Sequence, residues 1–219
     1  MRPRLAAVAV LLSAAMAAPA LADCSTEVAL AVQAMGKQKF LRKETDAVGE
    51  SGPFKMLVEY GIPDRMRQVL TPLTENKPVE AIVVGDKAWT NSGEGWVESG
   101  EAEKTQLVTY MIKSSSQIYQ EVGKFECIGT EKVDGRELRG YRGLDPDPDP
   151  MAKGKDTKTK NEAVRIMYLD PASGLPARSI FARAGMLDKP IFKEIYTYPA
   201  DIKIEAPANA KKAPAPAAK

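Results

Sequence analysis

Hydrophobic residues recur at helical spacing in two segments of the chain. In the first, Val28, Val32 and Met35 fall on one stripe, and the glycine that follows can end the helix. The second starts at Glu101, and its hydrophobic stripe consists of Leu107, Val108, Met111, Ile112, Ile118 and Val122. Serines at 114–116 lower the helix propensity in its middle, so we expect a break or bend there.

Elsewhere the hydrophobic spacing changes to two, which predicts strands. The clearest strand is residues 54–60, whose apolar face consists of Phe54, Met56, Val58 and Tyr60, with Leu57 as the exception to the alternation. Further strands are expected at 65–71, 79–84, 88–90, 96–97, 124–133, 137–144, 164–169, 177–183 and 191–198. Short turns such as Asp134-Gly135 and Ser173-Gly174 separate neighbouring strands, so the sheet should be antiparallel. Two helices covering such a sheet predict an α+β fold.

The N-terminus has the pattern of a cleaved export signal. Two arginines supply positive charge, a run of thirteen apolar and small residues follows, and Ala20-Leu21-Ala22 matches an A-x-A cleavage site. A membrane anchor is the weaker alternative, because such a run is too short to cross about 30 Å of hydrocarbon. Lipidation of Cys24 is also disfavoured, since a lipoprotein signal wants a small residue where Asp23 stands. We therefore expect residues 1–22 to be removed by cleavage after Ala22.

Export would place the two cysteines of the chain in an oxidising compartment. Cys24 and Cys127 are an even pair with none left over, which in an exported protein most simply forms one disulfide. A redox role is disfavoured because the C-x-x-C spacing is absent. Closing a loop of about 100 residues stabilises a protein by about 4.7 kcal/mol in the chain-entropy model. We interpret Cys24 as a structural cysteine.

Composition narrows the possible functions. The full chain has 31 Lys and Arg and 29 Asp and Glu residues, and loss of Arg2 and Arg4 with the signal leaves a formal net charge of zero. This balance argues against a nucleic-acid partner, which needs concentrated positive charge. The chain has no histidine, which excludes Ser-His-Asp and Cys-His catalysis and histidine-bound zinc or copper. Since no nucleophile or phosphate-binding motif appears either, we expect no enzyme, no metal and no other cofactor.

The mature chain divides into one domain and a tail. Residues 23–206 are expected to form a single domain, since no linker interrupts them. Residues 207–219 contain only Ala, Pro and Lys apart from Asn209, which predicts a disordered tail. This cationic tail could touch anionic lipid or cell wall, although a solvated extension is favoured. Within the domain, residues 145–160 begin with DPDPDP, whose regularly spaced aspartates resemble calcium ligands. The alternating prolines stiffen the chain into an extended form in which these aspartates point apart. We therefore interpret residues 145–160 as a mobile loop.

Several segments of the mature chain follow one another in an order typical of a known superfamily. They are the hairpin FKMLVEYGIPDRMRQVL, the strand pair VEAIVVGDKAWTNSGEGWVES with the helix after it, the hairpin IMYLDPASGLPARSIFAR and the segment KEIYTYPADIKI. Over most of residues 36–205 they resemble the periplasmic lipoprotein-carrier (LolA-like) superfamily and its outer-membrane lipoprotein-sorting relatives. The resemblance implies a strongly curved antiparallel sheet, an open half-barrel, with helices covering its concave face. The cysteine pair, DPDPDP and the basic tail depart from the family pattern.

The resemblance also implies a hollow that binds acyl chains or lipidated partners. The residues expected to line it are Phe54, Met56, Val58, Tyr60, Trp89, Trp96, Leu107, Met111 and Ile112. Unbranched methionines suit a pocket that accepts varied acyl chains, although methionines on amphipathic elements are more often ordinary core. The two tryptophans flank a glycine-rich turn, where they either guard the mouth of the hollow or pack on the adjacent hairpin.

Three functional hypotheses follow. The leading one is a monomeric periplasmic binder or carrier of a hydrophobic ligand, either a lipid or a lipidated protein, without catalytic activity, cofactor or membrane span. The alternative is a cell-envelope module for protein interaction or sensing that uses the same shell without carrying lipid. An enzyme acting on envelope lipids has the least support, because no base or nucleophile constellation is visible in the sequence.

Overall fold

The computed structural model describes residues 23–116, 123–144, 147–148, 162–183 and 185–213. This part of the chain forms two helices, α1 (Cys24–Met35) and α2 (Glu101–Ser116), and one antiparallel sheet. The strands are β1 (Phe40–Gly49), β2 (Gly52–Gly61), β3 (Arg65–Pro72), β4 (Val79–Val84), β5 (Lys87–Asn91), β6 (Val97–Glu98), β7 (Phe125–Val133), β8 (Arg136–Gly143), β9 (Asp147–Pro148), β10 (Glu162–Leu169), β11 (Pro176–Arg183) and β12 (Phe192–Thr197). These bounds confirm the strands predicted from residue 54 onward to within a few residues.

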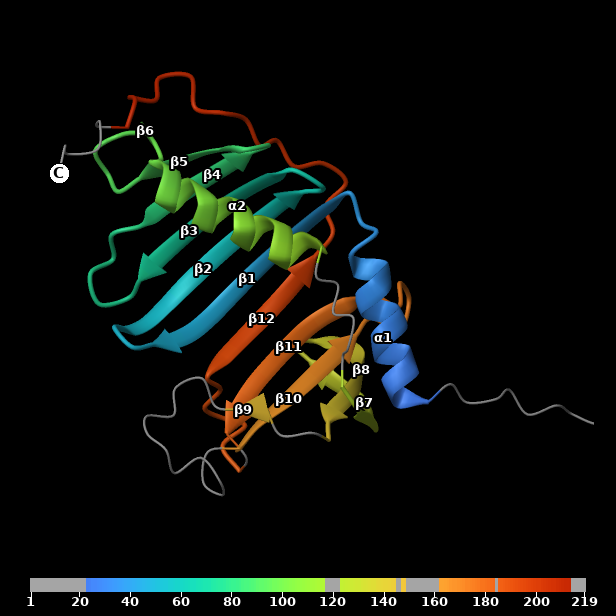
Figure 1. Cartoon of the computed structure of the whole chain (residues 1–219). Coiled ribbons are helices and arrows are strands. Elements are labelled where there is room, and N and C mark those ends of the chain that lie inside the picture. The colour runs from blue at the N-terminus through green and yellow to red at the C-terminus, as the bar shows by residue number, and fades with distance from the viewer. Residues whose placement is uncertain (1–22, 117–122, 145–146, 149–161, 184, 214–219) are drawn as a thin grey trace, which may run out of the picture.

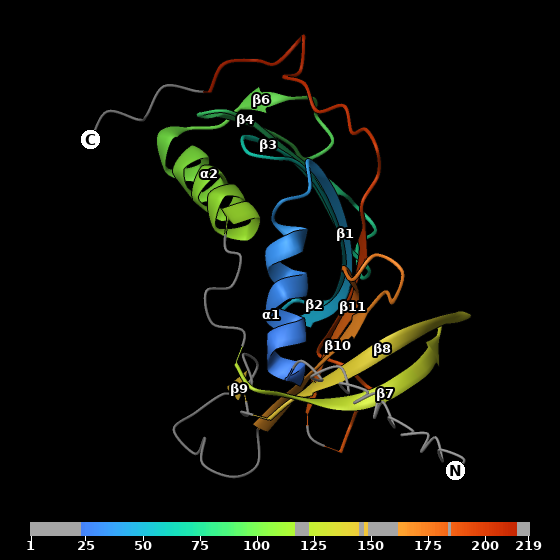
Figure 2. The same ribbon diagram turned by 90° about the vertical axis from the view of Figure 1, so that its right-hand side faces the viewer.

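The sheet is open and curved, and both helices lie on its concave face (Figures 1 and 2). Its strand order is β6-β5-β4-β3-β2-β1-β12-β11-β10-β8-β7, with β9 paired to β10 beside this path, so β6 and β7 are the two edges. Helix α1 contacts β7, β10 and β11, whereas α2 contacts β4 and β5. The predicted α+β fold, a curved antiparallel sheet with helices on its concave side, is confirmed.

Strand β1 was missed by the sequence analysis, although it lies at the centre of the sheet. It pairs with β2 on one side and with β12 on the other, and so joins the two halves of the sheet. Four of its ten residues are charged, which hides the alternation of buried and exposed positions. Leu41 and Thr45 are nevertheless 4% and 6% exposed and lie on the concave side, as does Lys43 between them.

The main hydrophobic core fills the space between the helices and the concave face. Helix α1 contributes Val28 and Val32, which are 0% and 1% exposed. They pack in one cluster with residues of the sheet and of α2, which include Leu41, Val58, Tyr60, Met66, Val83, Met111, Tyr141 and Met167. Helix α1 ends at Gly36, as its sequence predicts. In the part of the chain that is described, neither helix is long and apolar enough to cross a membrane.

The disulfide predicted from the cysteine count is confirmed. Cys24, the first residue of α1, is bonded to Cys127 of β7, with their Cα atoms 5.5 Å apart. Next to it, the Ser25 hydroxyl accepts a hydrogen bond of 2.9 Å from the backbone N–H of Phe125. The N-terminal end of α1 is therefore tied covalently and by a hydrogen bond to an edge strand of the sheet.

Three other segments can be compared with their predictions. The serines at 114–116 stand at the end of α2, and Ile118 and Val122, which were expected to extend it, lie outside the described residues. Of the loop predicted at 145–160, only residues 147–148 are described, and they pair with β10. The turn predicted at Asp134-Gly135 is present, with φ of 49° and 82° at its two residues.

The C-terminal segment, which follows β12 and is described as far as residue 213, contacts the sheet, whereas a solvated tail was expected at 207–219. Lys211 forms a parallel bridge with Val97 of β6. Its N–H donates to the Trp96 carbonyl over 2.9 Å, and its carbonyl accepts from the Glu98 N–H over 2.8 Å. Main-chain hydrogen bonds need no particular side chain, so a segment of Ala, Pro and Lys can still dock along a sheet edge. Residues 214–219 lie outside the described part.

Candidate functional site

Strand β2 places its apolar face beneath α2, as its alternation predicts. Val58 and Tyr60 are 0% and 1% exposed, and Met56 is half-buried beside them. They share one hydrophobic cluster with Leu107 and Met111 of α2. The structure therefore brings together five of the residues expected to line a hollow. Phe54, at the start of the same face, is half-buried and lies outside this cluster.

Helix α2 lies on the sheet through a narrow contact. Met111 is 2% exposed, whereas Leu107, Val108 and Tyr110 are only partly buried. Ile112 is 50% exposed, so the structure does not bring it into the hydrophobic cluster with its neighbour Met111. Helix α2 thus has one deeply buried apolar side chain, which is flanked by half-buried ones.

The two tryptophans do not lie on the concave face. Trp89 pairs with Ile82, and both belong to a separate cluster with Ile204 of the C-terminal segment, against which Trp96 also packs. Alternation explains this position, because Ala88 joins the core beneath α2 and the next side chain along β5 must point the other way. Their assignment to the hollow is therefore corrected, and they hold the C-terminal segment on the convex face.

A polar cluster lies on the same concave face as the apolar residues. Its centre is the Glu194 carboxylate of β12, which is 3.1 Å from the Lys43 ammonium. Tyr196 donates a hydrogen bond of 2.5 Å to this carboxylate, and Thr45 donates one of 3.5 Å. The side chains of Lys43 and Glu194 are 18% and 14% exposed to solvent. An ion pair that retains some exposure borders an accessible space rather than a sealed core.

The charge states of this cluster are well defined. Burial is the largest single effect and lowers the pKa of Lys43, but Glu194, Tyr60 and Tyr110 together outweigh it, so the pKa of Lys43 lies above its ordinary value. Burial, followed by the nearby Tyr110, raises the pKa of Tyr60. At neutral pH Lys43 is thus a cation paired with an anion, and Tyr60 is uncharged.

The Tyr60 hydroxyl is an exception to the rule that buried polar atoms are paired. It is buried, and within the described residues it has no hydrogen-bond partner at 3.5 Å or less. Tyr110 and Ser114 of α2 lie close enough to affect its pKa. Hydrogen bonding with these two side chains contributes to the pKa of Tyr60, so they lie at or just beyond hydrogen-bond distance of its hydroxyl.

Sequence reasoning missed this polar cluster. A single lysine or glutamate in a strand normally indicates a solvent-facing position, and β1 was itself missed. The signal is parity, since Lys43 stands two residues from Leu41, and Glu194 stands two residues from the buried Tyr196. Each charged residue therefore shares a face with buried residues of its own strand.

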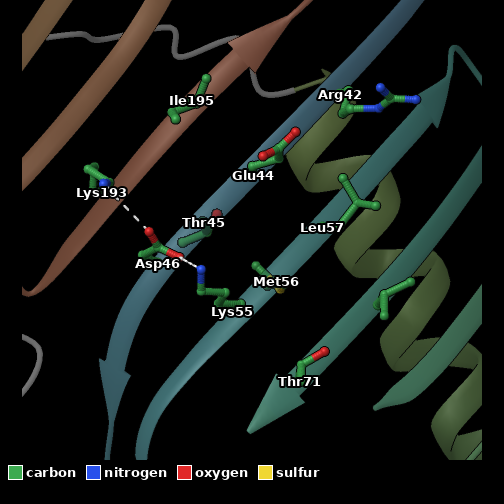
Figure 3. A pocket seen from close by; sticks show the side chains of 11 residues that line it. Arg42, Glu44, Thr45, Asp46, Lys55, Met56, Leu57, Thr71, Lys193 and Ile195 are labelled. Atoms are coloured by element: carbon green, nitrogen blue, oxygen red, sulfur yellow. Dashed lines mark ion pairs between the residues drawn. The ribbon is translucent and has the colours of Figure 1, made fainter. Parts of the chain in front are cut away.

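The convex face carries a different kind of cavity, of about 430 Å³, shown in Figure 3. There Asp46 of β1 forms ion pairs with Lys55 of β2 at 3.7 Å and with Lys193 of β12 at 3.5 Å. Leu57 and Ile195 are among its apolar residues, and α2 lies behind the sheet in this view. The convex cavity thus has a mixed lining, in which five of eleven residues are charged. Across the described residues, no group of three or more acidic or cysteine side chains could hold a metal ion.

Comparison with known proteins relates the chain to solved structures through its fold. No protein-family model and no curated protein sequence matches it. The structure of the lipoprotein LppX from Mycobacterium tuberculosis is similar with a TM-score of 0.56 at 15% identity, over 83% of this chain and 98% of LppX. LprF from Mycobacterium bovis is similar with a TM-score of 0.57 at 14% identity, over 85% of this chain and 97% of LprF.

At such identities the likeness is one of fold alone. A LolA-superfamily protein from Nitrosomonas europaea also matches, at 10% identity over 84% of this chain and 94% of its own, but its TM-score of 0.31 is too low to support an argument. The curved, open antiparallel sheet that the resemblance implied is present, and this chain shares its fold with LppX and LprF.

Proposed function

We propose that this protein is a periplasmic, non-catalytic binder or carrier of a hydrophobic ligand, held between α2 and the concave face of the sheet. The observation that carries the proposal is the narrow contact of α2, in which Met111 is buried while Leu107 and Tyr110 are only partly so. Apolar surface of this kind gains about 0.8 kcal/mol for each methylene group that it removes from water. An acyl chain is the simplest ligand that can exploit it.

Other features support the proposal. The N-terminal pattern of an export signal and the Cys24–Cys127 disulfide fit an oxidising envelope compartment. The fold is shared with LppX, which is named as a lipoprotein. The absence of histidine from the sequence removes the commonest general base. A carrier needs a deformable apolar surface rather than a reactive group, and the residues gathered beneath α2 supply such a surface.

The second candidate is an envelope protein-interaction or sensing module, and one feature favours it. Edge strand β7 is nine residues long and mostly exposed, and in the described part of the chain it pairs only with β8. An exposed edge offers main-chain donors and acceptors to an extended peptide. A pull-down that recovers one envelope protein, with no lipid in the purified material, would favour this candidate.

The decisive experiment has two arms. Protein expressed with its own signal is extracted and examined by mass spectrometry for bound lipid. Purified protein is also titrated with N-phenyl-1-naphthylamine, a probe whose fluorescence rises in apolar surroundings. We expect co-purified lipid and saturable probe binding. If neither appears, the carrier proposal is wrong.

Two tryptophan substitutions then locate the binding face. Met56→Trp adds bulk on the concave face and should reduce probe binding about tenfold, because its ring occupies space that the probe needs. Leu57→Trp adds a ring at the neighbouring residue of the strand, whose side chain points to the opposite face of the sheet, and should leave probe binding unchanged. Equal effects of the two variants would contradict the placement of the ligand beneath α2.

A further inference from the structure

We propose that the Lys43–Glu194 pair is a polar anchor that selects an uncharged amphiphile, one whose polar group carries ester or hydroxyl oxygens, over a fatty-acid anion. The inference rests on the proposed function, since it concerns the polar end of a ligand whose chain lies beneath α2. The Lys43–Glu194 pair lets the concave face distinguish ligands by their polar groups, which an apolar surface alone cannot do.

The register of the sheet places the anchor next to the apolar wall. Lys43 of β1 is directly opposite Val58 of β2 and Tyr196 of β12, and Thr45 is opposite Met56 and Glu194. Directly opposed residues of an antiparallel pair have neighbouring side chains on the same face. A chain that packs along Met56 and Val58 therefore passes beside the Lys43 ammonium.

The charge of the pair sets the preference. Lys43 and Glu194 are 3.1 Å apart and cancel each other, so the site offers no net positive charge to an incoming anion. A second carboxylate at Lys43 would also stand near Glu194, and like charges repel strongly where water is partly excluded. An uncharged oxygen avoids both the repulsion and the cost of stripping an anion of water.

Hydrogen-bonding capacity remains for such an oxygen. An ammonium group has three N–H donors. Glu194 uses one donor of Lys43, and the structure contains no second ion pair of this lysine among the described residues. The buried Tyr60 hydroxyl, which has Tyr110 and Ser114 of α2 as polar neighbours, lies near enough to Lys43 to interact with its charge. Together they can donate to a carbonyl or hydroxyl oxygen of a ligand inserted beneath α2.

The test is a competition between two ligands that share one acyl chain. Bound N-phenyl-1-naphthylamine is displaced from the full mature chain at pH 8 by monopalmitoylglycerol, which is uncharged, or by palmitate, which is an anion. We expect wild-type protein to bind the glycerol ester about tenfold more tightly than palmitate, which corresponds to about 1.4 kcal/mol.

Two variants assign the preference to the anchor. Glu194→Gln leaves Lys43 as an unpaired cation, so palmitate should gain about tenfold and the preference should vanish or reverse. The matched control is Glu44→Gln on the neighbouring position of β1, whose side chain lines the convex cavity, and it should keep the wild-type preference. If Glu194→Gln folds poorly, the double change Lys43→Met with Glu194→Met removes both charges. It should weaken binding of the glycerol ester and narrow the preference below tenfold without reversing it, because the anion still pays its desolvation cost.

The outcomes separate this inference from the proposed function. No probe binding by wild-type protein overturns the proposed function and the anchor together. Probe binding with equal displacement by both ligands, or an unchanged preference in Glu194→Gln, overturns the anchor and leaves the carrier proposal standing. A preference that is lost equally in Glu44→Gln also overturns the anchor, because the effect would then follow the charge of the whole protein.

Discussion

The two helices lie on the same face of one sheet but are held in different ways. Helix α1 carries Val28 and Val32, which are at most 1% exposed, and a disulfide fixes its first residue to β7. Helix α2 has one buried apolar residue, Met111, and its neighbour Ile112 is half exposed. Helix α1 is thus buried in the core along one face, whereas α2 contacts the core mainly through one buried side chain.

Polar contacts widen the difference. Tyr141 of β8 donates a hydrogen bond to Glu27 of α1, and Ser25 bonds to β7. In the first turn of α2, Lys104 forms an ion pair of 2.9 Å with Glu101 of the same helix. Local opening is cheapest where few buried contacts are lost. We therefore expect α2 to open locally more readily than α1.

The largest expected effect comes from removing the disulfide. Cys24 and Cys127 are 103 positions apart, and a loop of that length contributes about 4.7 kcal/mol in the chain-entropy model. Replacing both cysteines by serine should lower the free energy of unfolding by about 3–5 kcal/mol, as measured by urea denaturation. A loss below about 1 kcal/mol would mean that α1 owes little of its attachment to the disulfide.

A matched pair of methionines sharpens the comparison. Met35 of α1 and Met111 of α2 are both buried, at 9% and 2% exposure. Met→Ala changes in cores cost about 2–5 kcal/mol, with the lower costs where the surroundings can close the gap. We expect Met111→Ala at about 2 kcal/mol and Met35→Ala about 1 kcal/mol higher, because α2 can settle toward the sheet. The reverse order would make α2 the more firmly packed helix.

Tyr141→Phe tests the hydrogen bond that holds α1. Losing a bond to a carboxylate should cost about 1.5–3 kcal/mol, measured again by urea denaturation. Burial, then the bond to Glu27, raises the pKa of Tyr141 to about 12. The unfolded chain loses this proton near pH 10, so its stabilising effect is complete below pH 10 and is lost as the pH rises toward 12. Melting temperatures should fall less steeply over this range in Tyr141→Phe than in wild type.

The smallest expected effect concerns the strand that leads into α2. Lys211 makes two main-chain hydrogen bonds to the β6 region, so deleting residues 207–219 should cost about 1 kcal/mol. Lys211→Pro removes the donor to Trp96 at constant chain length and should reproduce about half of that loss. Identical melting curves for all three proteins would show that this docking contributes nothing.

Alternation and residue counting predicted much of the fold. They located ten of the twelve strands, the first helix and the disulfide, because each depends on a local pattern or on the presence of a single possible partner. They missed β1, whose charges mask its period, and β9, a pair of residues defined only by its contact with β10. They left open whether Trp89 lies at the hollow or packs on the adjacent hairpin, since the alternation of a five-residue strand is too short to assign its sides without its neighbours.

The site was predicted in part for the same reason. Met56, Val58 and Tyr60 stand out as an apolar face within one strand, so their position beneath α2 could be inferred. Lys43 and Glu194 come from two strands far apart in the chain, and only the pairing of β1 with β12 brings them together. No property of either segment alone indicates that pairing.

The central position of β1 sets the order in which the chain can complete its sheet. Strands β1 to β6 follow one another as neighbours and can pair as soon as they emerge, but the second edge of β1 waits for β12, which ends at residue 197. Until then a ten-residue strand remains open in the middle of the future sheet, where another chain could add to it. Lys43 and Glu194 meet across that seam, so the polar anchor forms only when the last strand has arrived.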